Sequence, residues 1–336
     1  MKKTLIVVST ISILLLVFIV GNFLKNNSTY FKLSSDENNQ NSPVEEFNLD
    51  NIGTDPSFTF SKDQEEPKIT VYIAKTNTIE EMMLEEYLAG VIAQEMNPNW
   101  PIEALAAQAI ASRTLTLHAI KQGYIQKLRG ADVSTLKEEL QAYEPEKIND
   151  NILQAVKMTR GQILVYEGKL INAIYGSCDG QITATAEESF PQINHPTPYL
   201  IPVKDKCFEY APPGIREWIL KISAAEIGKK LGIKRRIRSI TIMEKGPSGR
   251  ALYLSVENKK IHGAVFRRLI GYDKLKSTLI TNITYQNGYF IFQGQGWGSG
   301  VGLCQWGAYT YTQEGLNFKE ILNHYYPGTT IEQIWE

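Results

Sequence analysis

The sequence predicts an α+β fold that follows a single N-terminal transmembrane helix. An apolar run at residues 4–24 has about the length that spans a bilayer. Apolar residues recur with helical spacing between residues 84 and 120, and short stretches with alternating apolar residues flank this region and predict strands. With 336 residues and 43% hydrophobic composition, the chain can bury a substantial core.

The N-terminal run has the flanks of a membrane anchor. Lys2 and Lys3 precede it, and Lys25 follows it. No A-x-A-like cleavage site follows a short apolar core, which favours an uncleaved anchor over a secretory signal peptide. Lysines before the span place the N-terminus in the cytoplasm. We therefore expect a single-pass cell-membrane protein, with an anchor at 1–25, a flexible polar linker at 26–67 and an ectodomain at 68–336 outside the cytoplasm.

Composition narrows the class of function. The formal net charge of −1 gives no electrostatic case for nucleic acid, whereas 17 tyrosines and five tryptophans favour a carbohydrate partner. Three cysteines are too few for a disulfide scaffold, and the four histidines lie far apart. The sequence therefore predicts no metal site, no cofactor and no Ser/His/Asp triad.

The ectodomain is expected to open with a strand and to continue as a pair of helices joined by an Asn/Pro elbow. A small-residue loop, GSCDGQITATAEE, follows two strands, and a second lobe is expected at about 212–289. The predicted strands are 68–75, 162–168, 169–175, 238–244 and 251–257. The predicted helices after the pair are near 136–142, 151–159, 224–231, 263–269, 305–314 and 318–326.

Glu95 lies within the apolar face of the first helix. It falls about 20° from Leu84 on a helical wheel, among Leu88, Val91 and Ile92. Pro98 then ends the helix, so the carboxyl stands at the negative end of the helix dipole. Burial and the dipole both raise the pKa of Glu95, as a general acid near neutral pH requires.

Arg113 lies on the apolar face of the second helix, so the two helices are expected to direct a carboxylate and a guanidinium toward a shared interior. Two interpretations are open: a buried structural ion pair, or an acid at the floor of a cleft with a cationic neighbour. A close ion pair would lower the pKa of Glu95. We therefore expect Arg113 to meet Glu95 through a substrate group or water.

The chain after about Lys68 carries a series of long motifs: YLAGVIAQEM, PIEALAAQAIASRT, AVKMTRGQIL, the Tyr175-Gly-Ser loop, PYLIPVKD, GWGSGVGLCQWGA and ILNHYYPGT. Together these motifs resemble the stage II sporulation protein D family of peptidoglycan lytic transglycosylases. The resemblance implies a curved two-lobed ectodomain with a central glycan groove, and a lone catalytic glutamate at Glu95. It implies substrate-binding roles for Arg113, Gln108, Tyr175, Ser177, Tyr199, Lys204 and Gln305. It also implies action in spore engulfment on glycan strands already stripped of stem peptides, beside a cell-wall amidase and a membrane partner.

The sequence departs from the family pattern at three places. Cys178-Asp179-Gly180 stands where Ser-Gly-Gly or Cys-Gly-Gly is frequent, Gly298-Ser299-Gly300 where Gly-His-Gly is common, and Cys304 where a serine is frequent. Some relatives hold zinc near the cysteine-glycine loop, but no histidine lies beside Cys178, so we expect none. Cys178 and Cys207 flank the expected groove; a disulfide and two free thiols are both open.

The resemblance implies cleavage with one carboxylate. The C6 hydroxyl of the substrate attacks the anomeric carbon and gives a 1,6-anhydro product, while Glu95 acts first as acid and then as base. A second carboxylate could come from Asp179, Glu187, Glu188 or Asp205, which lie in polar stretches where solvated loop positions are expected. A hydrolase that uses water and a non-enzymatic wall-binding enhancer of an amidase are the alternatives.

Overall fold

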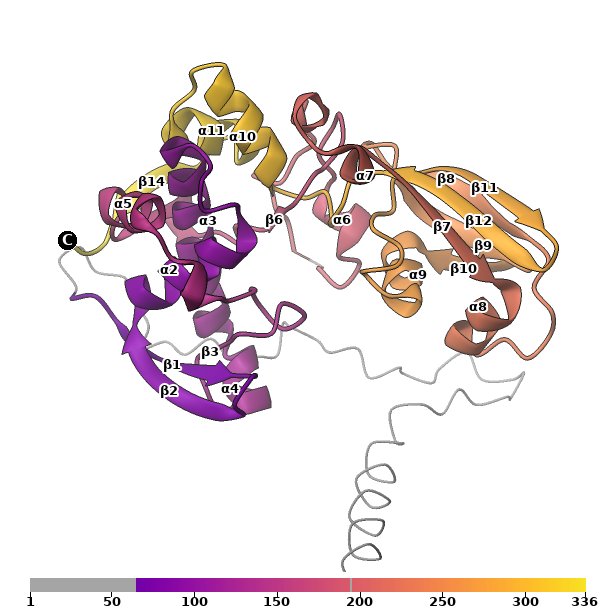
Figure 1. Cartoon of the computed structure of the whole chain (residues 1–336), viewed down its shortest axis with the longest axis horizontal. Coiled ribbons are helices and arrows are strands. Elements are labelled where there is room, and N and C mark those ends of the chain that lie inside the picture. Colours follow the sequence, from indigo (N-terminus) through magenta and orange to yellow (C-terminus); the bar gives the residue numbers. More distant parts are fainter. Residues whose placement is uncertain (1–64, 194) are drawn as a thin grey trace, which may run out of the picture. The chain divides into compact units, whose positions relative to one another are not determined.

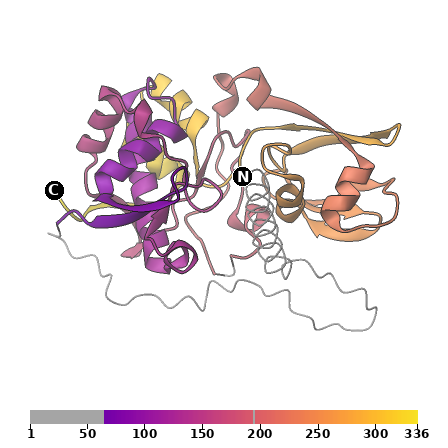
Figure 2. The same ribbon diagram turned by 60° about the horizontal axis from the view of Figure 1, so that its bottom comes forward.

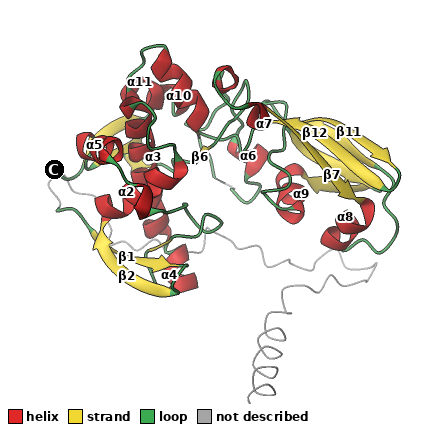
Figure 3. Cartoon of the chain, in the orientation of Figure 1, coloured by secondary structure: helices red, strands yellow, loops and turns green. Residues whose placement is uncertain are grey.

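The computed structural model describes residues 65–193 and 195–336. The predicted anchor and nearly all of the predicted linker fall in residues 1–64, outside the described residues. In the described ranges, no helix combines the length and apolar character needed to cross a lipid bilayer. The predicted mixed α+β class is confirmed: helices and small sheets alternate along the chain (Figure 3).

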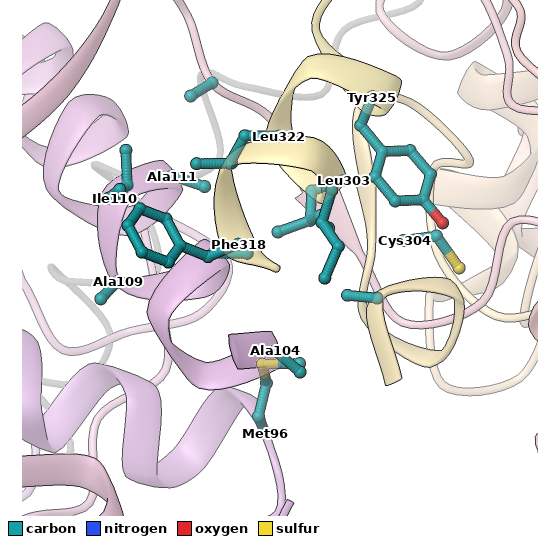
Figure 4. Close-up of a cluster of buried hydrophobic side chains, with 14 of the residues drawn as sticks. Met96, Ala104, Ala109, Ile110, Ala111, Leu303, Cys304, Phe318, Leu322 and Tyr325 are labelled. Atoms are coloured by element: carbon teal, nitrogen blue, oxygen red, sulfur yellow. The ribbon is translucent and has the colours of Figure 1, made fainter. Parts of the chain in front are cut away.

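Helix α3 (Ile102–Gln122) is the centre of the helical part of the protein. It contacts the helices α2 (Leu84–Glu95), α5 (Asp150–Met158), α10 (Gln305–Gln313) and α11 (Phe318–Tyr325), which gather around it in both views (Figures 1 and 2). Its alanine-rich face lets these neighbours approach closely. Phe318 and Leu322 of α11 lie beside Ile110 and Ala111 of α3 in the main core (Figure 4).

Both helices of the predicted pair end for reasons visible in the sequence. Helix α2 ends at Glu95 because Met96 is extended and Pro98 follows two residues later. Helix α3 ends at Gly123, whose φ of 64° is the left-handed conformation that glycine adopts readily. The elbow between the helices therefore holds Glu95 at a helix terminus.

Three small sheets accompany the helices. Strand β1 (Lys68–Ile73) pairs with β2 (Thr78–Met83) and β3 (Val133–Ser134), and β4 (Gln162–Tyr166) pairs with β14 (Thr330–Gln333) and β5 (Lys169–Leu170). Strand β6 (Tyr175–Gly176) runs parallel to β13 (Leu303–Cys304). Because α10 begins directly after β13, this pairing brings the loop after Gly176 to the first turn of α10.

A second group of strands has its own core. Two antiparallel sheets have the orders β11-β12-β7 and β10-β9-β8, and they lie with α8 and α9 (Figure 3). Phe266, Phe290 and Phe292 lie in a hydrophobic cluster separate from the core around α3. The predicted boundaries of the second lobe stay a prediction. The elements are β7 (Glu217–Ser223), α8 (Ala224–Leu231), β8 (Ile240–Lys245), β9 (Ala251–Val256), β10 (Lys259–His262), α9 (Gly263–Ile270), β11 (Ile280–Gln286) and β12 (Tyr289–Gln295).

Two predicted elements are wrong. Residues 136–140 form a turn rather than a helix, and Gln141 leaves it because its side chain bonds to Thr116 Oγ1 at 2.8 Å. The predicted strand 169–175 is broken, because β5 pairs with β4 whereas β6 pairs with β13. The remaining short helices are α4 (Tyr124–Arg129), η3 (Pro145–Lys147), α6 (Ala186–Ser189), η4 (Cys207–Glu209) and α7 (Pro213–Arg216).

Candidate functional site

Glu95 is the last residue of α2, and its carboxyl group is held by two donors. Oε1 accepts the backbone N–H of Ala142 at 2.9 Å, and Oε2 accepts Nε2 of Gln305 at 3.4 Å. Burial raises the pKa of Glu95, and the hydrogen bonds from Ala142 and Gln305 oppose this rise. The net direction is upward, so Glu95 retains its proton to a higher pH than an ordinary glutamate.

A pocket of about 430 Å³ opens at Glu95. Within the described residues, Glu95 is the only acidic residue that lines it, and Lys147 is the only cationic one. The Nζ of Lys147 donates to Gln94 Oε1 at 2.6 Å. The pocket is lined by Ala93, Gln94, Glu95, Met96, Asn97, Pro98, Trp100, Lys147, Ser177, Gln305 and Trp306. Among the described residues, the pocket therefore offers one carboxyl group and no second one in its lining.

Three of the residues predicted to bind substrate lie near the candidate acid: Ser177 and Gln305 line its pocket, and Tyr175 lies close to Glu95. The Trp306 N–H donates to the Ser177 carbonyl at 3.0 Å, which fixes the loop to α10. The Tyr175 hydroxyl donates to Gln141 Oε1 at 2.8 Å. Burial, followed by the negative charge of Glu95, raises the pKa of Tyr175, which keeps its hydroxyl a donor.

The structure does not bring Gln108, Tyr199 and Lys204 to the pocket. Gln108 is buried in α3 and donates to Ser112 Oγ at 2.9 Å. The Tyr199 hydroxyl accepts the Asn172 N–H at 3.1 Å. Lys204 is exposed, and its backbone carbonyl accepts the Tyr311 hydroxyl at 3.2 Å. Their predicted roles in substrate binding stay predictions.

The expectation that Arg113 and Glu95 share one interior is wrong. Arg113 is fully buried and pairs with Glu85, with Nε at 2.9 Å from Oε1 and Nη2 at 2.6 Å from Oε2. Glu85 lies ten residues before Glu95 in α2, which is about 15 Å along a helix. A helical wheel gives the face of a helix but not the position along its axis, so it could not show which of the two glutamates Arg113 meets.

The other carboxylates that could assist Glu95 lie elsewhere. Asp179, Glu188 and Asp205 are buried, so the expected solvated positions are wrong for these three. Glu188 closes the capping box of α6 and accepts the Ser248 hydroxyl at 2.6 Å. Glu187 is exposed, as expected. None of the four lines the Glu95 pocket in the part of the chain that is described.

The three cysteines form one buried cluster. The sequence analysis did not predict that Cys304 would belong to it. The sulfur atoms of Cys178 and Cys207 lie 2.8 Å apart as free thiols, and Cys304 Sγ accepts the Asp179 N–H at 3.3 Å. Asp205, Cys207 and Cys304 place ligand atoms within 4.8 Å of one another, the one such group in residues 65–193 and 195–336. Sulfur and carboxylate oxygen are zinc ligands, so the expectation of no metal stays a prediction.

Sequence reasoning missed Ala142, Lys147 and Trp100 at the site. Trp100 carried a usable signal, because it lies in the elbow directly after the helix that ends at Glu95. Ala142 acts through its backbone N–H, which no residue pattern reveals.

Two family models match parts of the chain. A family model described as stage II sporulation protein matches residues 72–166, the range that contains Glu95. A model of a domain of unknown function (DUF8618) matches residues 208–302, which include the second group of strands.

Curated proteins are similar over most of the chain. Stage II sporulation protein D of Bacillus subtilis is 30% identical over 289 residues, which cover 79% of each chain. An uncharacterised protein of Brachyspira hyodysenteriae is 34% identical over 75% of this chain and 67% of its own length. The amidase enhancer of Bacillus subtilis is 28% identical over 73% of this chain, but only 40% of its own length is covered. The chain belongs to the stage II sporulation protein D family.

Proposed function

We propose that this protein is a lytic transglycosylase that cleaves peptide-stripped peptidoglycan strands to 1,6-anhydro-muramyl products during sporulation engulfment. One observation carries the proposal: burial raises the pKa of Glu95, and no other carboxylate lines its pocket in the described residues. Ordinary glycosidases use two carboxylates, one of which acts as nucleophile or activates water. Attack by a hydroxyl group of the substrate itself needs only one group that gives and then takes a proton.

The proposed reaction begins with protonated Glu95. Its proton passes to the oxygen of the scissile glycosidic bond. The C6 hydroxyl oxygen of the same muramoyl sugar bonds to the anomeric carbon as the bond to the leaving sugar breaks. Glu95, now a carboxylate, accepts the hydroxyl proton, which restores the acid without water. The Ala142 N–H and the Gln305 side chain orient the carboxyl group and stabilise its charged form between the two transfers.

The cellular setting is part of the proposal. The run at residues 4–24 would anchor the protein in the cell membrane, with the rest of the chain outside the cytoplasm. A cell-wall amidase would supply the stripped strands, and a membrane partner would hold the enzyme at the site of engulfment. N-terminal sequencing of membrane-extracted protein tests the anchor: a mature start beyond residue 24 contradicts it.

Replacement of the acid tests the assignment of Glu95. Glu95→Gln keeps the size of the side chain and removes the ionisable proton, so the cleavage rate on peptide-stripped glycan should fall at least ~10²-fold. Glu187→Gln is the matched control, because Glu187 is exposed and does not line the pocket. A Glu95→Gln variant that melts like the wild type and cleaves at the wild-type rate contradicts the assignment.

The second candidate function is that of a non-enzymatic enhancer of a cell-wall amidase. The similarity to the amidase enhancer of Bacillus subtilis, at 28% identity over 73% of this chain, favours it. Amidase activity on intact wall, measured with and without the purified protein, tests this function. Stimulation that persists in Glu95→Gln, with no fragments released from stripped glycan in the absence of amidase, would favour the enhancer.

A further inference from the structure

A second depression of about 750 Å³ adjoins the Glu95 pocket. The two share Asn97, Trp100 and Trp306 in their linings, so they form one continuous surface. Its remaining lining comes from the elbow before α3, from the first residue of α3, from α5, and from Tyr210 and Tyr309. A polymer bound with one unit at Glu95 would therefore place a neighbouring unit in this depression.

Four aromatic rings from three parts of the chain meet there. The ring centroids of Trp100 and Trp306 lie 4.6 Å apart, and those of Trp100 and Tyr309 lie 5.1 Å apart. The ring centroids of Tyr309 and Tyr210 lie 5.5 Å apart. Trp100 belongs to the elbow, Trp306 and Tyr309 to successive turns of α10, and Tyr210 follows η4. The geometry thus assembles a cluster from segments far apart in the sequence.

Core packing accounts for only half of this cluster. Trp100 and Trp306 pack against the main core, as tryptophans at helix ends often do, whereas Tyr210 and Tyr309 do not. Tyr210 is 49% exposed. Within the described ranges, the two tyrosine hydroxyls and the two indole N–H groups have no protein hydrogen-bond partner. Aromatic side chains of this kind present an apolar face and a free polar edge to a ligand.

The lining of the depression is neutral and carries amides. Asn97, Asn99 and Asn151 line it, and no charged residue does so among those described. A neutral surface of rings and amides suits the apolar face, the hydroxyls and the acetamido group of an uncharged N-acetylated sugar. None of its described lining residues is a cation that could pair with the carboxylate of a muramic acid unit, whereas Lys147 lines the Glu95 pocket.

We propose that the rings of Trp100, Tyr210, Trp306 and Tyr309 form a subsite for N-acetylglucosamine. This assignment rests on the proposed function, which puts the muramoyl unit at Glu95. Because the two sugars alternate along a glycan strand, either neighbour of a muramoyl unit is N-acetylglucosamine. The subsite is therefore the same whichever way the strand runs through the pocket.

Calorimetric binding of chitotetraose, an N-acetylglucosamine tetramer, to the full-length chain in detergent tests the subsite. Tyr210→Ala and Tyr309→Ala should each raise Kd about three- to tenfold, which corresponds to about 0.7–1.4 kcal/mol. Tyr210→Phe retains the ring and should change Kd less than about twofold. Tyr272→Ala removes a tyrosine of similar exposure, 43%, from outside the depression and should leave Kd unchanged. Glu95→Gln should bind like the wild type.

The outcomes separate the subsite from the proposed function. If the wild type binds chitotetraose through these rings but releases no fragments from stripped glycan, the subsite holds and the transglycosylase proposal fails. If the wild type cleaves glycan while both tyrosine-to-alanine variants keep the wild-type Kd and KM, the subsite is wrong. A wild-type protein that does not bind chitotetraose also overturns it.

Discussion

Removal of the Arg113 guanidinium should lower the stability of the folded protein and not only weaken substrate binding. Glu85 accepts two hydrogen bonds from Arg113, one from the Gly161 N–H at 3.0 Å and one from the Trp335 indole at 3.0 Å. Arg113 Nη1 also donates to the Gln162 carbonyl at 3.0 Å. One buried ion pair thus joins α2 and α3 to the start of β4 and to the C-terminal segment.

The expected loss of stability follows from the Glu85 carboxylate, which would remain buried without its cation. Breaking a buried pair from one side typically costs about 3–5 kcal/mol, because the remaining charge is uncompensated. Arg113→Met should therefore lower the free energy of unfolding by about that amount. Combining it with Glu85→Gln removes the orphaned charge, while an amide oxygen can still accept from Gly161 and Trp335. The double variant should cost about 1–3 kcal/mol less than the sum of the single variants.

Urea unfolding, followed by tryptophan fluorescence, measures these differences. Arg129→Met is the matched control, because Arg129 pairs with Glu139 at a partly exposed site and should cost at most about 1 kcal/mol. An Arg113→Met variant that loses less than about 1 kcal/mol of stability but fails to cleave glycan would refute the structural role. Arg113 would then act on the substrate, as the family resemblance implies.

Four further predictions concern Glu95, the thiols and a glycine, and the first two are both about Glu95. Because burial raises the pKa of Glu95 above about 4.5, the cleavage rate should fall as pH rises through that raised pKa; a rate that keeps rising with pH contradicts it. The folded state also binds this proton more tightly, so Glu95→Gln should be more stable than the wild type above pH ~4.5, and the gain should vanish below it. Three thiols should react under denaturing, non-reducing conditions; a count of one would show that two of the three form a disulfide and would contradict this. Gly302→Ala should cost at least ~2 kcal/mol, because φ is +77° and a Cβ would collide with the Ile174 carbonyl, whereas Gly214→Ala meets open space; equal melting temperatures would refute this.

The part of the site that could be predicted from sequence is local to one helix. The apolar stripe of α2 and the proline after it placed Glu95 at a buried helix end, and the structure has α2 ending at that residue. Periodicity also predicted the burial of Arg113. It could not predict the partner, because Glu85 and Glu95 both lie toward the core side of α2 and only the packing of β4 and the C-terminus selects between them.

The remaining features depend on contacts between distant segments. Gln305 reaches Glu95 across 210 residues of sequence, through the pairing of β6 with β13. The turn at residues 136–140 delivers the Ala142 N–H, but its composition resembles a short helix. The aromatic cluster likewise joins Trp100 to Trp306, which lie far apart in the sequence. Such long-range pairs carry no local periodicity, so a single sequence does not reveal them.

The products of glycan cleavage test the central claim most directly. Peptide-stripped strands would be digested by the wild-type protein in ¹⁸O-labelled water, and the fragments would be weighed by mass spectrometry. One-carboxylate chemistry at Glu95 predicts 1,6-anhydro-muramyl ends, which are lighter than reducing ends by one water and contain no ¹⁸O. Fragments whose new reducing ends carry ¹⁸O would show attack by water and contradict the account.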